Sequence, residues 1–310
     1  MNWQPLIDPE TARLRARMLA GIRRFFHQRD VLEVTTPVLS ACGVTDPHIE
    51  SVGVHDGTWL RTSPEYRHKR LLAAGFGDLY EIGPAFRQGE HGHRHRREFT
   101  LLEWYRLGWT WQALAEEVIA LIEAVSAELG YDRAGTGVDW MTWHEAFARR
   151  FDIDPDRADA AALKRLAGPA APEGGRHILL DWLFATGIQP ALAADRITVI
   201  CDFPPEQAAL ARIRPGKRPV AERFEIFIGD MELANGYQEL TDAETQQQRF
   251  EEDNRQRRRL GRPEMPIDAA LLSALQAGLP ECAGVALGVD RLVMAIGGID
   301  DIGRLYGFAD

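Results

Sequence analysis

Phe86-Arg87-Gln88-Gly89-Glu90 and, much later in the chain, Gly284-Val285-Ala286-Leu287-Gly288-Val289-Asp290-Arg291 are the two stretches of sequence that decide the fold. The first runs on through Arg94-His95 to Glu98-Phe99-Thr100-Leu101-Leu102-Glu103-Trp104-Tyr105. Each stretch places an arginine beside small or acidic residues. Arginine suits phosphate because its planar guanidinium donates two parallel hydrogen bonds and stays charged at any relevant pH. The pattern is therefore typical of a site for a bent, triply charged nucleotide.

In this order and spacing, the two stretches resemble motifs 2 and 3 of the class II aminoacyl-tRNA synthetases. A third segment is similar to motif 1 of that family. Asp8-Pro9-Glu10 predicts the start of an amphipathic helix that ends near residues 28–30, and the extended segment 31–39 follows it. Motif 1 forms the homodimer interface in the family, so the resemblance implies a homodimer.

The resemblance also implies an α/β (α+β) fold, namely the class II synthetase catalytic fold with a central, mostly antiparallel β-sheet flanked by helices. One catalytic domain is expected over residues 1–310. No anticodon-binding domain is expected, because motif 1 begins almost at residue 10. Within the domain we expect motif 1 at about 10–40, motif 2 at about 79–106, a variable insertion at about 131–219 and motif 3 at about 283–298.

Local patterns predict the main elements of this domain. Residues 59–105 should alternate short strands with turns, and the insertion should form alanine-rich helices. Thr241 and Glu244 have the spacing of a capping box at the start of a polar helix that ends at Gly261. Further elements are expected as a helix at about 110–129, strands at 223–228, 231–240 and 284–288, and a last helix from about residue 290.

Composition restricts the class of protein. A hydrophobic fraction of 45% and a charged fraction of 26% are ordinary for a soluble globular chain, and no apolar run is long enough for a membrane span. The N-terminus lacks a secretory pattern, and the 3 cysteines lack metal or disulfide spacing, so a cytoplasmic protein is expected. The net charge of −10 disfavours a grip on tRNA, which would need a strongly basic face.

The resemblance implies that the chain uses ATP and Mg²⁺. Arg87 would bind the α-phosphate and the substrate carboxylate, Arg291 would bind the γ-phosphate, and the carboxylates of Glu225 and Glu232 would hold magnesium. The alternatives are a surface ion pair from Arg87 to Glu98 or Glu103, and exposed strand glutamates. The expected catalytic residues are Arg87, Arg291 and Glu232, and the expected ATP contacts are Arg87, Gln88, Gly89, Glu90, Arg96, Phe99, Glu232, Leu233, Gly288 and Arg291.

The amino-acid pocket is expected from segments that resemble those of lysyl-tRNA synthetases. Glu65 and Glu239 would each meet one of two ammonium groups, since a buried ammonium needs a paired charge, and Tyr105 would add a phenolic hydrogen bond. The substrate would then be lysine or a lysine isomer. The residues expected to bind it are Ser63, Pro64, Glu65, Tyr105, Asn235, Tyr237, Glu239 and Ala286.

The chain resembles, over essentially its entire length, the truncated paralogues of lysyl-tRNA synthetase that ligate (R)-β-lysine to a lysine of elongation factor P. Ala286 replaces the middle glycine of the synthetase pattern, and its methyl group would crowd an α-amino group, which favours β-lysine. Gly89-Glu90 and Arg96-Arg97 depart from the usual motif 2. Two alternatives stay open: a minimal enzyme that charges tRNA with lysine, and a non-catalytic paralogue that senses an amino acid.

Overall fold

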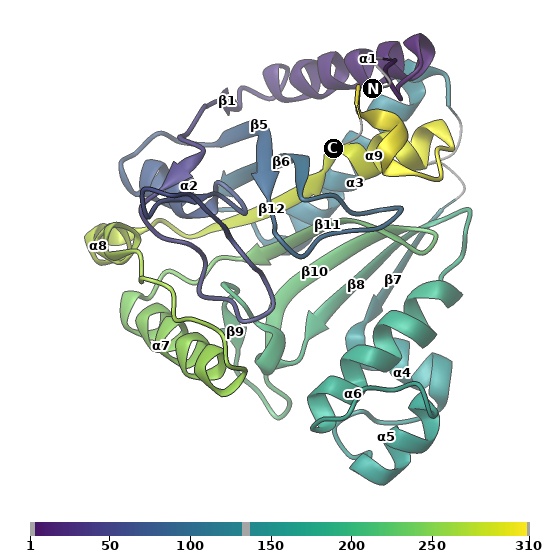
Figure 1. Ribbon diagram of the computed structural model, residues 1–310, viewed down its shortest axis with the longest axis vertical. Coiled ribbons are helices and arrows are strands. Elements are labelled where there is room, and N and C mark those ends of the chain that lie inside the picture. The colour runs from purple at the N-terminus through teal and green to yellow at the C-terminus, as the bar shows by residue number, and fades with distance from the viewer. Residues whose placement is uncertain (1–3, 132–136, 309–310) are drawn as a thin grey trace.

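The computed structural model describes residues 4–131 and 137–308. A nine-stranded sheet runs through the protein in the order β1-β5-β6-β12-β11-β10-β8-β7, with β9 paired to β10 (Figure 1). Its neighbours are antiparallel except for the outer pairs β1/β5 and β7/β8, which are parallel. The strands of this sheet are β1 Leu32–Glu33, β5 Leu79–Phe86, β6 Glu98–Leu107, β7 Val138–Thr142, β8 Ile197–Phe203, β9 Ile213–Arg214, β10 Val220–Ile228, β11 Met231–Gln238 and β12 Cys282–Gly288.

A small second sheet and the helices surround the main sheet (Figure 1). The small sheet has the order β2-β4-β3, with β2 Leu39–Ser40, β3 Val52–Gly53 and β4 Trp59–Leu60. The α-helices are α1 Pro9–His27, α2 Glu65–Ala73, α3 Trp111–Leu129, α4 Trp143–Phe151, α5 Ala160–Ala167, α6 Arg176–Leu183, α7 Ala243–Arg259, α8 Ala269–Gly278 and α9 Val289–Gly297. None of the described helices is both long and apolar enough to cross a membrane.

The main core lies between one face of the sheet and the helices α1, α3 and α9 (Figure 1). Asp8 caps α1 by accepting hydrogen bonds from the next turn, as the sequence predicts, and Met18, Ile22 and Phe26 of that helix are fully buried. Strand residues of alternate positions, such as Trp104 and Leu287, complete this core. The expected helix at 110–129 is confirmed as α3, with Thr110 as its N-cap.

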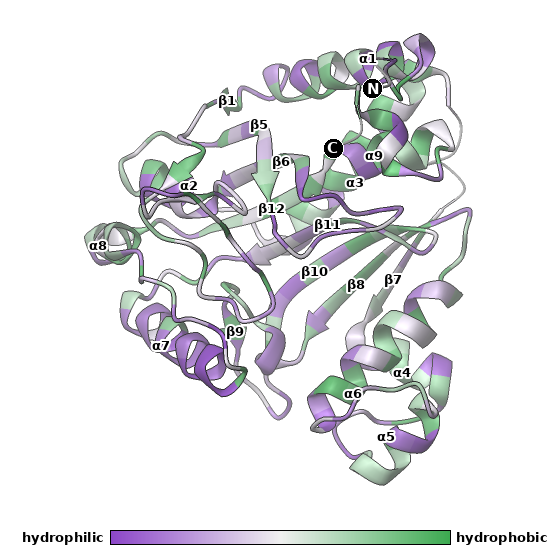
Figure 2. Cartoon of the chain, viewed as in Figure 1, coloured by the Kyte–Doolittle hydropathy of each residue, from purple (hydrophilic) through white to green (hydrophobic). Residues whose placement is uncertain are grey.

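The opposite face of the sheet is covered at its two ends and left accessible in its middle. The helices α2, α7 and α8 cover one end, where Leu79 and Tyr105 join their apolar cluster. The insertion helices α4, α5 and α6 cover the other end through a separate cluster that includes Phe203 and Phe227. Figure 2 shows that α7 is largely hydrophilic, as the sequence predicts for this helix. A polar site therefore lies between the two covered ends.

Three local predictions are wrong. Residues 65–73 form the helix α2 rather than strands and turns, because the run from Glu65 to Ala73 contains strong helix formers between Pro64 and Gly75. The described part of the insertion contributes three strands, β7, β8 and the short β9, because the apolar run Ile197–Phe203 pairs in parallel with β7 and extends the sheet. Helix α7 is capped by Asp242, whose side chain accepts from the Thr245 amide, and not by a box from Thr241.

Candidate active site

The strand register gathers polar residues from five strands on the accessible face of the sheet. Because alternate residues of a strand share a face, a row that crosses paired strands places its side chains together. One row brings Asn235 opposite Ala286, and Ala286 opposite Glu103. The full row is Glu225, Asn235, Ala286, Glu103 and Glu81, and the next row is Arg223, Tyr237, Gly284, Tyr105 and Leu79.

The members of these rows on β6, β11 and β12, with Arg223, line a cavity of about 1560 Å³. Arg87 lines the same cavity, so the expected amino-acid residues and the motif 2 arginine lie around one space. Pro64 is not part of the lining and instead precedes α2 as its N-cap residue. The expected amino-acid residues in the lining are Ser63, Glu65, Tyr105, Asn235, Tyr237, Glu239 and Ala286.

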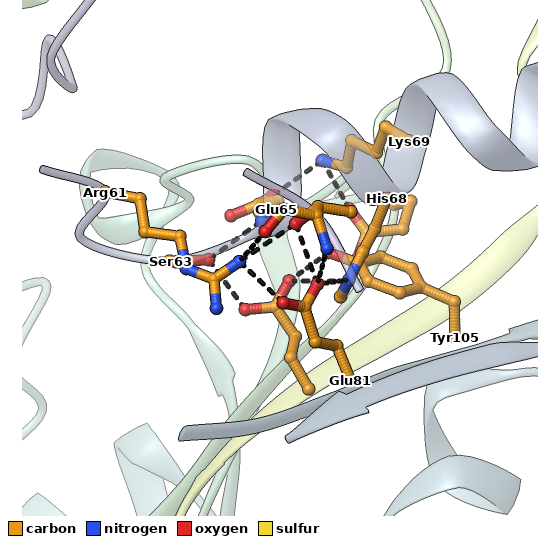
Figure 3. A network of polar contacts seen from close by, with 10 residues as sticks. Arg61, Ser63, Glu65, His68, Lys69, Glu81 and Tyr105 are labelled. Atoms are coloured by element: carbon orange, nitrogen blue, oxygen red, sulfur yellow. Dashed lines mark hydrogen bonds and ion pairs between the residues drawn. The ribbon is translucent and has the colours of Figure 1, made fainter. Parts of the chain in front are cut away.

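Lys69 on α2 stands between two of the expected substrate carboxylates. Its Nζ atom lies 2.7 Å from Glu65 Oε1 and 2.7 Å from Glu239 Oε2, and it is buried (Figure 3). Burial opposes its charge, but the carboxylates of Glu239 and Glu65 raise the pKa of Lys69 above its usual range. Among the described residues, Lys69 pairs with one oxygen of each acid, Glu65 Oε1 and Glu239 Oε2, and this Glu239 oxygen takes no hydrogen bond. The two acids therefore already share one cation.

Glu103 is an acidic residue of the cavity that sequence analysis did not place in the amino-acid pocket. It lies on β6 and lines the cavity, and its carboxylate accepts hydrogen bonds from Ser63 Oγ at 2.6 Å and from Tyr105 Oη at 2.9 Å. No lysine or arginine among the described residues pairs with it. Burial and the Glu103 charge raise the pKa of Tyr105, so its hydroxyl stays a donor. The strand alternation of Glu103 and Tyr105 was the signal available in the sequence.

A second ion pair lies behind Glu103. Arg61 Nη1 is 2.7 Å from Glu81 Oε1, and Thr36 donates to Glu81 Oε2 from its hydroxyl at 2.7 Å and from its amide at 3.2 Å. Burial alone would raise the pKa of Glu81, but hydrogen bonds from His68, Thr36 and Arg61 hold it at about 2. Arg61 also donates to the Pro84 carbonyl, which ties the segment before α2 to β5. Glu81 is thereby a fixed anion that supports the pocket and does not line it.

The charges of the pocket leave an anionic excess. The carboxylates are the buried Glu81, Glu103 and Glu239 and the partly buried Glu65, and the buried permanent cations are Lys69 and Arg61. With all four carboxylates ionised and the histidine neutral, four anions and two cations give 4 − 2 = 2 uncompensated negative charges. Buried charge demands a partner. The pocket therefore suits a ligand that carries two positive groups.

Gly284 leaves room for two residues of the pocket. A Cβ atom at this position would collide with the Tyr105 ring and with Glu239 Oε1. Gly288 differs, since an added Cβ would meet only the Arg291 side chain at an ordinary 3.7 Å.

The two motif arginines face a common histidine. Arg87 Nη1 lies 3.4 Å from Glu90 Oε1, and Glu90 Oε2 lies 3.6 Å from His95 Nε2. Burial and then the charge of Arg291 lower the pKa of His95, and Arg87 lowers it further, against Glu90 and Glu232. Both guanidinium groups are thus within electrostatic range of one imidazole. Arg87 pairs with Glu90 and not with Glu98 or Glu103, which were the alternative partners.

Several contacts of Arg87 and Arg291 fit a binding site for an anion. Arg87 Nε is buried without a hydrogen-bond partner among the described residues, and the Arg87 guanidinium lies 5.1 Å from the Phe99 ring centroid. Phe99 is half-buried and belongs to none of the apolar clusters, so a stacking face is available. Arg291 donates to the carbonyls of Arg94 and Glu232.

The acids expected to hold magnesium lie close to each other at the hairpin of β10 and β11. A β-bulge opposite Ile226 and Phe227 puts both Leu233 and Ala234 into the main core, which turns Glu232 to the accessible face. Leu233 could therefore contact a nucleotide only through its backbone. Burial and the Glu232 charge raise the pKa of Glu225 to about 7, although Arg223 pairs with it and opposes this shift.

The remaining expected ATP residues lie on the loop between β5 and β6. The Gln88 amide donates to the Glu50 carbonyl, and Gly89 and Glu90 line a smaller cavity of about 460 Å³ beside Arg87. Arg96 extends to the C-terminal segment, where its guanidinium lies 4.3 Å from the Tyr306 ring centroid. The observed ring contact of Arg96, which was expected to bind ATP, is therefore with a residue near the C-terminus.

Comparison with known proteins gives a consistent result. Residues 9–310 match the family model described as tRNA synthetases class II (D, K and N). The chain is 45% identical over 322 residues to an elongation factor P–(R)-β-lysine ligase of Klebsiella pneumoniae, with 99% of this chain and 97% of the relative covered. With the same coverage, it is 44% identical to the ligase of that name from Proteus mirabilis and 42% identical to that of Vibrio cholerae.

Proposed function

Because the chain belongs to the class II tRNA synthetases of the D, K and N type, we propose that it is an ATP-dependent ligase that activates (R)-β-lysine and transfers it to elongation factor P. The acceptor is the ε-amino group of a lysine on that factor. The relatives that carry this activity in their names are 42% to 45% identical over nearly the full length. The observation that carries the proposal is the buried, anionic pocket beside Arg87.

The pocket selects its substrate through the pairing of carboxylates with ammonium groups. Glu103, held by Ser63 and Tyr105, pairs with one ammonium group, because no described lysine or arginine occupies it. The carboxylates of Glu65 and Glu239 together take the other ammonium group. The sequence suggested one ammonium group for each of Glu65 and Glu239. We now assign one ammonium group to these two acids together, since Lys69 already neutralises part of their charge.

The carboxylate of the substrate is activated on the arginine side of the cavity. Arg87, whose Nε lacks a partner among the described residues, binds the substrate carboxylate and the α-phosphate of ATP, and Arg291 binds the γ-phosphate. Phe99 offers its ring to the adenine. The carboxylate attacks the α-phosphorus, the bond to the β-phosphate oxygen breaks, and pyrophosphate leaves with a β-lysyl-adenylate formed. Preorganised cations lower this barrier because charge develops on the phosphate oxygens.

Glu225 and Glu232 fit a magnesium ion that the nucleotide brings with it. Two carboxylates in mutual repulsion, one with a pKa raised to about 7, are hard oxygen donors that a divalent cation would stabilise. Among the described residues no group of three acidic, histidine or cysteine side chains could hold a metal alone. Magnesium would neutralise phosphate charge there, as it does in sites that it shares with phosphates.

Transfer to the acceptor needs a path for a lysine side chain. The cavity extends outward from Glu103 to Trp143 and Lys217 of the insertion and to Arg259 at the end of α7. A neutral acceptor amine entering there attacks the carbonyl carbon of the mixed anhydride and forms an amide, and AMP leaves. The acceptor nitrogen loses one proton in this step. The anionic phosphate of the leaving AMP is the nearest group that the reaction itself supplies to take it.

We infer that two copies of the chain associate through the motif 1 segment. Leu32 on the edge strand β1 and Leu39 on β2 are about half exposed, at 48% and 52%. A lone edge strand with exposed leucine is a surface that a second copy would cover. Sedimentation equilibrium should give a dimer, and Leu32→Glu together with Leu39→Glu should give a monomer. A wild-type monomer at micromolar concentration would contradict this inference.

Pyrophosphate exchange separates the proposed activity from its alternatives. The chain should exchange with (R)-β-lysine faster than with lysine, and the labelled amino acid should then appear on purified elongation factor P. Charging of tRNA without modification of the factor would favour the minimal synthetase instead. Binding of the amino acid without any exchange would favour a sensing protein.

A further inference from the structure

His68 is a buried histidine that the proposed reaction does not use. It lies on α2, its side chain is fully buried, and its ring meets the Tyr105 ring edge-on at 5.6 Å between centroids (Figure 3). Its Nε2 atom lies 3.0 Å from Glu81 Oε2, and its Nδ1 atom lies 3.4 Å from Glu103 Oε1. Nδ1 has no hydrogen-bond partner among the described residues. The imidazole thus stands between a fully bonded carboxylate and the carboxylate that faces the cavity.

The protonation state of the His68 ring decides whether Glu103 has a positively charged neighbour. A neutral imidazole has one N–H, and a cationic one has two. In the neutral form Nε2 donates to Glu81, so that Nδ1 turns a lone pair toward the Glu103 oxygen. In the cationic form both carboxylates receive a donor and Glu103 gains a positive neighbour. Burial opposes this charge, but the contacts with Glu103 and Glu81 raise the pKa of His68 above its ordinary value.

A cationic His68 and a substrate ammonium group are like charges at one carboxylate. With His68 cationic, the pocket has 4 − 3 = 1 uncompensated negative charge, which is too few for two ammonium groups; with His68 neutral, the count of two matches them. We propose that His68 is a positioning residue that sets the net charge around Glu103. Binding of the substrate ammonium at Glu103 and protonation of His68 therefore oppose each other. This inference rests on the proposed function in taking a diamino acid as the substrate.

Most other charged groups around His68 do not change in the same way. Arg61 stays cationic, and Lys69 lies on the same helix as His68, in an ion pair with Glu65. Tyr105 keeps its proton, because burial raises its pKa. The helix α8, which packs with α2 in one apolar cluster, carries no titratable side chain over Ala269–Gly278.

Glu239 and Glu65 are further pocket groups whose titration affects amine binding, since burial raises the pKa of each. Burial and the charge of Glu65 raise the pKa of Glu239 to about 8, against the pull of Lys69. Protonation of Glu239 at acid pH also weakens amine binding. The contribution of His68 is therefore the difference between the wild type and a variant without the histidine.

The test is the pH dependence of the KM for (R)-β-lysine in pyrophosphate exchange, between about pH 6 and 9. In the wild type, the His68 contribution should raise KM by up to about tenfold for each pH unit below the pKa of His68. His68→Gln, which keeps a donor for Glu81 and does not titrate, should lose this component and keep kcat at the alkaline end. His55→Gln, at an exposed loop position, should keep the wild-type profile. Superimposable profiles of wild type and His68→Gln would overturn the inference.

A second measurement does not need turnover. NMR titration of the histidine ring signals, with His68 assigned by the signal lost in His68→Gln or by a spin label at a neighbouring position, should show that saturating (R)-β-lysine lowers the pKa of His68. An unchanged or raised pKa would reject the coupling. A wild-type protein that exchanges pyrophosphate with neither isomer would reject the proposed function, and the NMR shift would still decide the role of His68.

Discussion

Ala286 on β12 lies directly opposite Glu103 on β6 in the strand register, and Asn235 on β11 lies opposite Ala286 on its other side. Ala286 is therefore on the floor of the pocket between the Asn235 amide and the Glu103 carboxylate. Asn235 Oδ1 is buried there without a partner among the described residues. We therefore expect the choice between amino-acid isomers to depend on the methyl group of Ala286.

Ala286→Gly should shift the isomer preference. Removing the methyl group makes room for an α-amino group, so kcat/KM for lysine should rise relative to that for (R)-β-lysine by about tenfold, the usual effect of one methyl-sized contact. Pyrophosphate exchange with both isomers measures this ratio in a single preparation. An unchanged ratio would show that Ala286 does not select the isomer.

Glu103→Gln should weaken amino-acid binding without unfolding the protein. The amide keeps acceptor and donor atoms for Ser63 and Tyr105, but it removes the charge that pairs with the ammonium group. Loss of one partner of a buried charge pair costs at least about 2 kcal/mol, so KM should rise about thirtyfold or more. Glu123→Gln on the exposed side of α3 is the matched control. A KM within threefold of the wild type would assign the amine to other carboxylates.

Lys69→Met should destabilise the protein in a pH-dependent way. The change leaves Glu65 and Glu239 buried without their shared cation, which costs about 3–5 kcal/mol in the free energy of unfolding at neutral pH. Folded-state pKa values of these acids then lie further above their unfolded values, so stability is retained near pH 4.5 and lost as pH rises toward 8. Urea unfolding across this range measures the loss, and Lys164→Met, exposed on α5, is the control. A pH-independent loss would contradict the ion-pair explanation.

Gly284→Ala should damage the pocket through crowding. The added Cβ must displace the Tyr105 ring or Glu239, and overpacking of this kind costs about 1–3 kcal/mol. Thermal unfolding should show a lower midpoint, and KM for the amino acid should rise more than KM for ATP. Gly53→Ala, where an added Cβ meets nothing within 4 Å, is the control. Equal increases in both KM values would indicate a nucleotide role for Gly284.

Arg87→Ala and Arg291→Ala should each slow pyrophosphate exchange. Removing one preorganised donor to a reacting phosphate typically lowers kcat by about 100-fold to 1000-fold, and the loss for Arg87 should appear in KM for the amino acid as well. Arg165→Ala, exposed on α5, serves as the control. Near-normal turnover without either arginine would refute the convergence of both groups on one nucleotide.

Much of the fold follows from local patterns in the chain. The N-cap of α1, the helix α3 and the hairpin of β5 and β6 lie where the sequence predicts them, because capping residues and hydrophobic periodicity act over a few residues. The prediction missed the helix α2, although the residues of this segment favour a helix. The strands β7 and β8 are missed because they are stable only once β10 supplies a partner.

The sequence by itself determined the arginines of the nucleotide side, the acidic character of the amino-acid pocket and the strands that carry both, since residue order and strand alternation are local properties. Only the tertiary structure decided that Lys69 stands between Glu65 and Glu239, whereas Glu103 has no described lysine or arginine as a partner. The reason is that the pairing of buried charges depends on distances between α2, β6 and the end of β11, which are far apart in the chain and meet only after folding.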